Sequence, residues 1–159
     1  MIDPGISTKE GEKLTSINQL LQNKGNQVWS VSPDSNVLEA LKTMAEKNIG
    51  AMVVLETDGT VCGIFSERDY ARKVVLDGRS SENTLIRDVM TSEVYYVRPQ
   101  DSVDRCMALM SEKRFRHVPV LDDDKALVGI ISIGDVVKTI IAEQQVLINH
   151  LEDFITGTR

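Results

Sequence analysis

Two serine–aspartate pairs are the residues of this sequence best suited to chemistry. Ser66 precedes Asp69 by three positions, and Ser132 precedes Asp135 by the same spacing. A carboxylate can accept hydrogen bonds from two neighbouring hydroxyls, such as a ribose diol, and a serine hydroxyl suits a phosphate oxygen. The same spacing also caps a helix, because each side chain can satisfy a backbone amide of the other residue. The spacing alone leaves both interpretations open.

Each pair belongs to a longer stretch that occurs twice in the chain. Gly63–Asp69 is repeated 66 positions later as Gly129–Asp135, and the offset continues without a gap from Val31–Tyr70 to Val97–Val136, where 13 of 40 positions are identical. The identities include polar residues as well as apolar ones. This pattern predicts one structural unit built twice, with a site that is repeated together with the fold.

The elements that must position these pairs follow from the apolar spacing. Each copy predicts a strand, a helix, two paired strands and a second helix, which is a mixed α/β (α+β) fold of two β-α-β-β-α repeats. The first copy has strands at 28–31, 49–55 and 61–65 and helices after Asp34 or Ser35 and from Glu67. The second has strands at 95–97, 118–121 and 127–131 and helices after Asp101 or Ser102 and from about Asp135.

The remaining segments complete the domain plan. Residues 1–25 are expected to form a polar arm and a short helix with Leu14, Ile17, Leu20 and Leu21 on one face, followed by repeats at 26–83 and 84–145 and a helical extension at 146–159. The last helix carries more apolar residues than one small repeat needs. It either packs on its own body or forms an intersubunit seam.

Composition excludes several functions. A net charge of −6 argues against binding of nucleic acid or an anionic membrane, since both need a basic face. The apolar runs are too short to cross a bilayer and the start does not resemble a signal peptide, so a cytoplasmic location is expected. Cys62 and Cys106 are expected to be buried thiols. With two histidines and no Cys-x-x-Cys, we expect no metal site.

The two copies in register resemble the cystathionine β-synthase (CBS) domain family. The resemblance rests on Gly-Ile-x-Ser-x-x-Asp in both copies, on the strand Arg116-His117-Val118-Pro119-Val120, and on the leading string Asp88-Val89-Met90-Thr91, and it covers about 28–138. It implies a pair packed with pseudo-twofold symmetry and two clefts between the copies. In the family these clefts commonly hold AMP, ATP, NAD-type dinucleotides or S-adenosylmethionine, with the aspartate on the ribose.

The resemblance implies two unequal sites in this chain. One combines Ser66, Arg68 and Asp69 with Thr91, Arg116 and His117, and the other combines Ser132 and Asp135 with Gln27, Val28, Gly50 and Ala51. Two arginines of the first are replaced by glycines in the second, so we expect the first to bind phosphates more strongly. Lys24, at the end of the preceding helix, is the candidate to add positive charge to the second.

Other residues have structural interpretations beside functional ones. His117 is as well explained by packing as by ligand contact, whereas Trp29 is expected in the core, with a base pocket as the alternative. Arg72 and Lys73 are expected to be solvated, and Met44, Met107 and Met110 to fill the core.

The expected function is a stand-alone, homodimeric regulatory module that binds an adenine nucleotide (AMP, ATP or NAD(H)) and acts through the dimer or an unidentified protein partner. The alternative is a scaffold that binds no ligand and associates through its last helix. An enzyme is not expected, because the sequence has no phosphate-binding loop, no dinucleotide fingerprint and no His-Glu-x-x-His.

Overall fold

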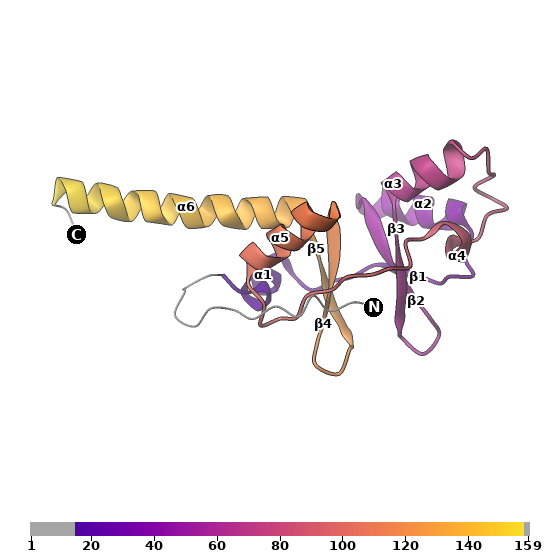
Figure 1. Cartoon of the computed structure of the whole chain (residues 1–159), viewed down its shortest axis with the longest axis horizontal. Helices are drawn as coiled ribbons and strands as arrows, with labels where there is room; N and C mark the ends of the chain where they lie inside the picture. Colours follow the sequence, from indigo (N-terminus) through magenta and orange to yellow (C-terminus); the bar gives the residue numbers. More distant parts are fainter. Residues whose placement is uncertain (1–14, 158–159) are drawn as a thin grey trace.

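The two copies of the repeat fold into two small sheets that lie side by side (Figure 1). The computed structural model describes residues 15–157; the predicted arm at 1–12 and Leu14 lie outside them. The first copy contains β1 (Ser30–Val31), α2 (Val37–Lys47), β2 (Ala51–Leu55), β3 (Val61–Ser66) and α3 (Glu67–Asp69), which continues into the π-helix η1 (Tyr70–Val75). Its sheet has the order β1-β2-β3, with β1 parallel and β3 antiparallel to β2.

The second copy repeats this plan with one strand fewer. It contains α5 (Val103–Lys113), β4 (His117–Leu121), β5 (Leu127–Ser132) and α6 (Ile133–Thr156), and β4 and β5 pair antiparallel. The strand predicted at 95–97 is wrong, because Tyr95 and Val97 form isolated bridges and no ladder; the bridge of Val97 is parallel, to Val120. Pro99 follows two positions later and has no amide hydrogen to extend the ladder.

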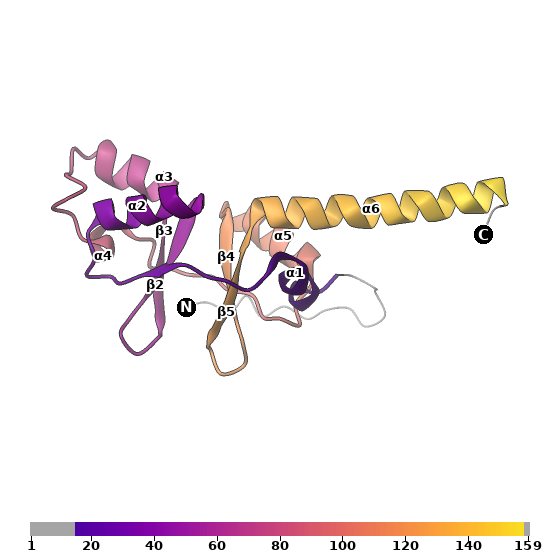
Figure 2. The same ribbon diagram turned by 180° about the vertical axis from the view of Figure 1, so that it is seen from behind.

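The helix that precedes each copy packs on the other copy. α1 (Ile17–Lys24) lies before the first copy but buries Ile17, Leu20 and Leu21 in the core of the second. α4 (Ile86–Val89) lies before the second copy but buries Ile86 and Val89 in the core of the first. Figure 2 shows the chain leaving α1 beside α5 and crossing to the first sheet. The two halves are therefore interlocked by an exchange of leading helices.

The repeated glycines Gly63 and Gly129 make room for these exchanged segments. A methyl group on Gly63 would lie 2.5 Å from the Met90 sulfur, and one on Gly129 would lie 2.7 Å from a Leu21 methyl carbon. Met90 ends α4 and Leu21 belongs to α1. A glycine within a strand often marks such a close approach of another segment. The repeated glycine is thus explained by packing.

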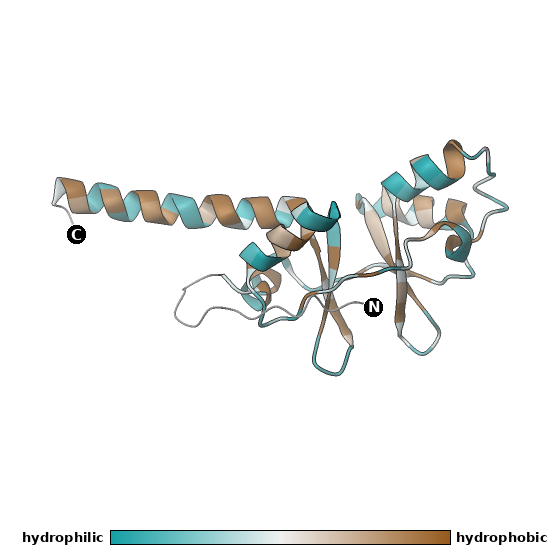
Figure 3. Cartoon of the chain, viewed as in Figure 1, coloured by the Kyte–Doolittle hydropathy of each residue, from teal (hydrophilic) through white to brown (hydrophobic). Residues whose placement is uncertain are grey.

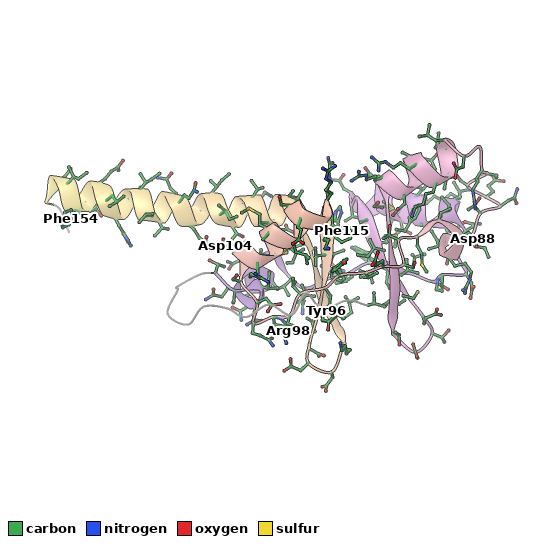
Figure 4. All side chains as sticks on the ribbon, in the orientation of Figure 1. Asp88, Tyr96, Arg98, Asp104, Phe115 and Phe154 are labelled. Carbon is green, nitrogen blue, oxygen red and sulfur yellow. The ribbon has the colours of Figure 1, made fainter. Side chains whose placement is uncertain are left out.

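A third apolar cluster joins the two sheets. Its buried members come from both copies and from the connection between them: Val53, Val61, Val94, Tyr96 and Leu121. Tyr96 lies between the sheets (Figure 4), and its hydroxyl accepts a hydrogen bond of 2.6 Å from the Lys125 ammonium. This hydrogen bond satisfies the polar end of a side chain that is otherwise buried among apolar groups.

Several local predictions need correction. α2 is capped by Asn36, which accepts from the Glu39 amide, and Asp34 instead pairs with Arg87. Ser102 caps α5 as predicted. Met107 was expected in the core but is 42% exposed, because it lies on the outer face of α5. Of the two free cysteines, Cys106 is buried and Cys62 only half-buried.

α6 extends well beyond the body of the molecule (Figure 1). Its first turns bury Val136 and half-bury Ile140 against the second copy, and Glu143 accepts a hydrogen bond from the Thr15 amide. Beyond this point apolar bands continue along its length (Figure 3). Their side chains are exposed, up to 81% for Ile155. The interpretation that the whole helix packs on its own body is therefore wrong.

Candidate functional site

Ser66 and Asp69 form a reciprocal cap at the point where β3 meets α3. The Ser66 amide donates to Asp69 Oδ2 at 2.9 Å and the Ser66 hydroxyl donates to the same oxygen at 3.0 Å, while the Asp69 amide donates back to the Ser66 hydroxyl at 3.2 Å. The capping interpretation of the spacing is confirmed. The same contacts fix the Asp69 carboxylate in one orientation and leave its other oxygen, Oδ1, for further donors.

Thr91 and Lys73 supply those donors to Asp69. The Thr91 hydroxyl donates to Asp69 Oδ1 at 2.9 Å, so the structure brings together two residues of the predicted site that are 22 positions apart. Thr91 reaches this place because its backbone pairs with Ile64 of β3 in both directions. The Lys73 ammonium lies 3.2 Å from Asp69 Oδ1. The expectation that Lys73 is only solvated is therefore wrong. Its position four residues after Asp69 could have predicted this ion pair.

Ser132 and Asp135 repeat the cap at the start of α6. The Ser132 amide donates to Asp135 Oδ2 at 2.8 Å, and the Asp135 amide donates to the Ser132 hydroxyl at 3.2 Å. Here the cation comes from a different element, because Lys24 of α1 donates to Asp135 Oδ2 at 2.5 Å and to the Ile130 carbonyl at 2.7 Å. Lys24 thus stands beside the predicted second site, as the sequence suggested.

The environment of Asp135 favours its charged form. Burial raises the pKa of the carboxyl, but the hydrogen bonds from Lys24 and Ser132 outweigh this effect, and the net result is a pKa below the ordinary value. Asp135 is therefore ionised at neutral pH. A ribose diol arriving at this carboxylate would have to share it with, or displace, the Lys24 ammonium.

His117 lies between the two copies. It opens β4 opposite Ser132, and a methyl group placed on Gly50 would lie 3.5 Å from its ring. Burial lowers the pKa of His117, and the positive charges of Lys24 and Arg116 lower it further, against an opposing effect of Asp135. His117 is consequently neutral at pH 7, and its ring can donate through one nitrogen and accept through the other.

The arginines of the predicted first site lie at the surface between the copies. The Arg68 guanidinium donates to the Arg114 carbonyl at 3.3 Å, a contact that links α3 of the first copy to the end of α5 in the second. Arg116 is exposed, and its carbonyl accepts from the Ile133 amide at 2.8 Å. No hydrogen bond among the described residues joins either guanidinium to Asp69.

The other predicted residues of the second site are spread along the strands. Ala51 is buried and pairs with Ser66 at the start of β2, and Gly50 precedes this strand and accepts through its carbonyl from the Glu67 amide at 3.1 Å. Gln27 is exposed and Val28 half-buried, in the segment that follows Lys24. Gly50 is connected to the second copy through its approach to His117.

A cavity of about 660 Å³ opens at the hairpin end of the two sheets. Its lining includes Val28 and the turn residues of both hairpins, among them Asp58 and Lys125, and Val28 is the one predicted site residue in it. The cavity therefore lies at the opposite end of the strands from Ser66 and Ser132. Val28 packs against the same apolar cluster as Ile130, whose carbonyl accepts a hydrogen bond from the Lys24 ammonium.

Within residues 15–157, no helix is both long enough and apolar enough to cross a membrane. The same residues contain no cluster of three histidine, cysteine, aspartate or glutamate side chains placed to hold a metal ion.

Comparison with known sequences finds one family over most of the chain. The model of the CBS domain matches twice, at residues 25–76 and 86–142. A mitochondrial CBS domain-containing protein of Arabidopsis thaliana, CBSX3, is 36% identical over 163 aligned positions, which cover 97% of this chain and 78% of the relative. The CBS domain-containing protein YhcV of Bacillus subtilis is 34% identical over 69% of this chain and 76% of its own length.

Comparison with solved structures gives the same answer for the fold. A protein with CBS domains from Burkholderia ambifaria is 50% identical, with a TM-score of 0.77 over 82% of this chain and 96% of its own. The CBS domain pair of protein MJ0100, solved with 5′-methylthioadenosine and S-adenosyl-L-methionine, is 23% identical, with a TM-score of 0.73 over 82% of this chain and 98% of its own.

Proposed function

Since the chain belongs to the CBS domain family, we propose that it is a regulatory module that binds an adenine nucleotide in the clefts between its two repeats. The nucleotide status of its surroundings would then pass to a dimer partner or to another protein. The observation that carries this proposal is the duplicated carboxylate: Asp69 and Asp135 are each held by the amide of their own serine, with a lysine ammonium 3.2 Å and 2.5 Å away, respectively.

These two carboxylates have the chemistry needed for a ribose. Each is oriented by backbone contacts before a ligand arrives, so little conformational freedom remains to be lost on binding. Each also has a side-chain donor, the Thr91 hydroxyl or the Lys24 ammonium, that a ribose diol can replace or supplement. A pre-formed acceptor of this kind supports recognition of the adenosine part that AMP, ATP and NAD(H) share.

The rest of the nucleotide would use groups from both repeats. The apolar seam between the sheets, with Val28 and Ile130 at its edge, supports binding of a base, and Arg68 and Arg116 at the surface support binding of phosphate. The fold itself accommodates adenosine compounds in the MJ0100 pair. In this chain the Lys24 ammonium offsets the missing arginines of the second site, so we propose binding at both clefts.

A calorimetric titration tests the proposal. The protein, stripped of nucleotide and checked by mass spectrometry, would be titrated with AMP, ATP, NAD, NADH and S-adenosylmethionine. We expect saturable binding with a micromolar dissociation constant for at least one of them. A folded protein that binds none of these ligands would overturn the proposal. Regulation further requires that the ligand bind two arrangements of the module with different affinity.

A second candidate function is a scaffold that associates through α6 without a ligand. The exposed apolar side chains from Val137 to Ile155 favour it, because a monomer rarely leaves such a surface uncovered. The titration separates the two candidates, since the scaffold predicts association in the absence of any nucleotide binding.

A further inference from the structure

The exposed face of α6 has a strict seven-residue pattern. Three sets of apolar residues recur at this interval along one side of the helix: Ile141, Ile148 and Ile155; Val137 and Leu151, with Gln144 between them; and Ile140, Leu147 and Phe154. In a coiled coil the first two sets are the a and d positions of the heptad, and the third is the g position. Such a repeat favours packing of this face against another helix.

The body of the molecule leaves this face open. In the first turn of α6 the body contacts the Ile133 amide and Asp135. Further along it contacts Val136, Glu143 and part of Ile140, which lie opposite or at the edge of the apolar stripe formed by these three sets of residues. Val137, Ile141 and Ile148 are about half exposed, and Phe154 and Ile155 are 79% and 81% exposed. Phe154 lies at the far end of the helix, away from any other element (Figure 4). The open face therefore runs the whole length of α6.

The polar residues beside the stripe indicate how a second copy would lie on it. In an antiparallel pair, a positions face d positions, which places Ile141 on Leu151 of the partner subunit, Ile148 on Gln144, and Ile155 on Val137. This register also brings Lys138 beside Glu152 of the partner subunit, twice by symmetry. Both side chains are exposed, and neither forms an ion pair within the described part of the chain.

A parallel pair would lack this complementarity. It would place each g residue beside an e residue of the other helix, so that Leu147 would meet Glu152 and Ile140 would meet Gln145. The antiparallel register instead places Leu147 on Leu147 of the partner subunit and Ile140 on Phe154. It also leaves the two bodies at opposite ends of the helix pair, where they do not compete for the same space.

We propose that two copies of this chain associate through an antiparallel pairing of their α6 helices, centred near residue 146. Seven side chains of the stripe are at least 46% exposed: Val137, Ile141, Leu147, Ile148, Leu151, Phe154 and Ile155. Covering their exposed parts removes on the order of 800 Å² per helix from water, which is about the area that one partner contributes to a standard interface. The pairing depends on α6 alone. It stands or fails independently of nucleotide binding.

The first test measures association by sedimentation. The natural chain is expected to be a dimer at micromolar concentration. Ile148→Glu should weaken dimerisation at least 100-fold, because it buries a charge in the seam, whereas Val146→Glu, on the opposite face of the same helix, should leave the dimer intact. Circular dichroism checks that both variants keep the fold. A natural chain that is monomeric at all concentrations, or equal effects of the two variants, would overturn the proposal.

The second test measures orientation with spin labels. Asn149→Cys and Thr156→Cys lie one heptad apart on the same face and would be labelled in a Cys62→Ser background, since the Cys106 thiol is buried. At 1.5 Å per residue, antiparallel helices offset the paired labels along the axis by about 9 Å at position 149 and about 30 Å at position 156. Parallel helices give nearly equal distances at both positions, and that result would overturn the proposal.

The third test exchanges the charges. Lys138→Glu alone is expected to weaken the dimer about tenfold, because two attractive contacts become repulsive. Adding Glu152→Lys should restore most of the affinity. A double variant that is as weak as the single one would contradict the antiparallel register.

Discussion

The Lys24 ammonium lies 2.5 Å from the Asp135 carboxylate, although 111 positions separate the two residues. α1, which carries Lys24, precedes the first repeat but packs on the second, so the lysine arrives at a motif of the other copy. The corresponding carboxylate of the first copy, Asp69, takes its ammonium from Lys73, four positions further along the chain. The two sites are thus built from the same cap and from different cations.

Replacing Lys24 by methionine should destabilise the protein at neutral pH and have little effect in acid. Ionised Asp135 stabilises the fold above its unfolded pKa of about 4, and this contribution is lost as the pH falls through the lowered pKa of the folded state. Removing Lys24 brings the two pKa values closer together. After allowance for solvent screening, the loss at neutral pH is on the order of 1 kcal/mol. Chemical denaturation from neutral to acid pH measures it, and a difference that does not change with pH would contradict the linkage.

His117 should titrate below its ordinary value of 6.5. Because the folded state favours the neutral ring, stability should fall as the pH drops below about 6.5. In Lys24→Met the pKa of His117 should move upward, since a nearby positive charge is gone. An NMR titration of the imidazole protons follows both proteins. A midpoint above 6.5, or one that Lys24→Met leaves unchanged, would contradict this description of the site.

Asp69→Asn should weaken adenine-nucleotide binding at the first cleft. The loss of a charge-assisted hydrogen-bonding group costs about 1.5 to 3 kcal/mol, which is about 10- to 150-fold in dissociation constant. Asp135→Asn is the matched variant for the second cleft, and calorimetry with the best ligand compares the two. Thermal unfolding checks that the caps survive. Unchanged affinity in both folded variants would remove the carboxylates from the proposed site.

Gly63→Ala and Gly129→Ala should each destabilise the protein by about 1 to 3 kcal/mol, because a methyl group would overlap the Met90 sulfur or a Leu21 methyl group. Gly134→Ala is the control. It lies near the start of α6, where a methyl group would make only an ordinary contact of 3.7 Å with the Ser132 hydroxyl, so alanine should stabilise the helix by up to about 1 kcal/mol. Urea denaturation compares the three. Equal effects at all three positions would mean that the glycines do not serve the close approach of α4 and α1.

The two thiols should differ in reactivity. Burial raises the pKa of Cys106 to about 12, so this thiol should react with a thiol reagent only after unfolding. Burial also raises the pKa of Cys62, but its side chain is half-exposed and should react slowly in the native protein. A titration with a chromogenic disulfide should therefore detect one thiol before denaturation and two after it. Rapid reaction of both would contradict the packing of α5.

The repeated unit could be predicted because a constant offset carries both apolar and polar identities. The Ser-x-x-Asp spacing offered a cap as one of two interpretations, and the structure shows the cap in both copies. The resemblance placed Thr91 with Asp69, and the two residues are hydrogen-bonded. The contact of Lys73 with Asp69 was not predicted, although the two residues lie one helical turn apart. The site residues that depend on the approach of the two copies, such as Arg116 and Gln27, remain predictions. So does the cytoplasmic location.

The exchange of α1 and α4 could not be predicted from periodicity. A pattern such as Ile17, Leu20 and Leu21 shows that a helix has an apolar face, but not which body covers it. The repeat did contain one indication of this exchange. Gly63 and Gly129 occupy the same position in the two copies, and a glycine within a strand often marks the close approach of another segment. The error at Met107 has a similar cause: helical spacing placed it near the core face, and the packing of α5 turned it outward.

The exchanged helices also decide the order in which the chain can assemble. During synthesis α1 emerges first, but Ile17 is held by the Asp101 carbonyl, which is added 84 residues later. The core of the first repeat is likewise incomplete until Ile86 and Val89, which follow that repeat in the chain, have been added. Closing such long loops costs entropy before any contact repays it, which makes folding slow and highly cooperative. Because each core is completed by a helix that precedes the other copy, the two repeats are expected to fold as one unit.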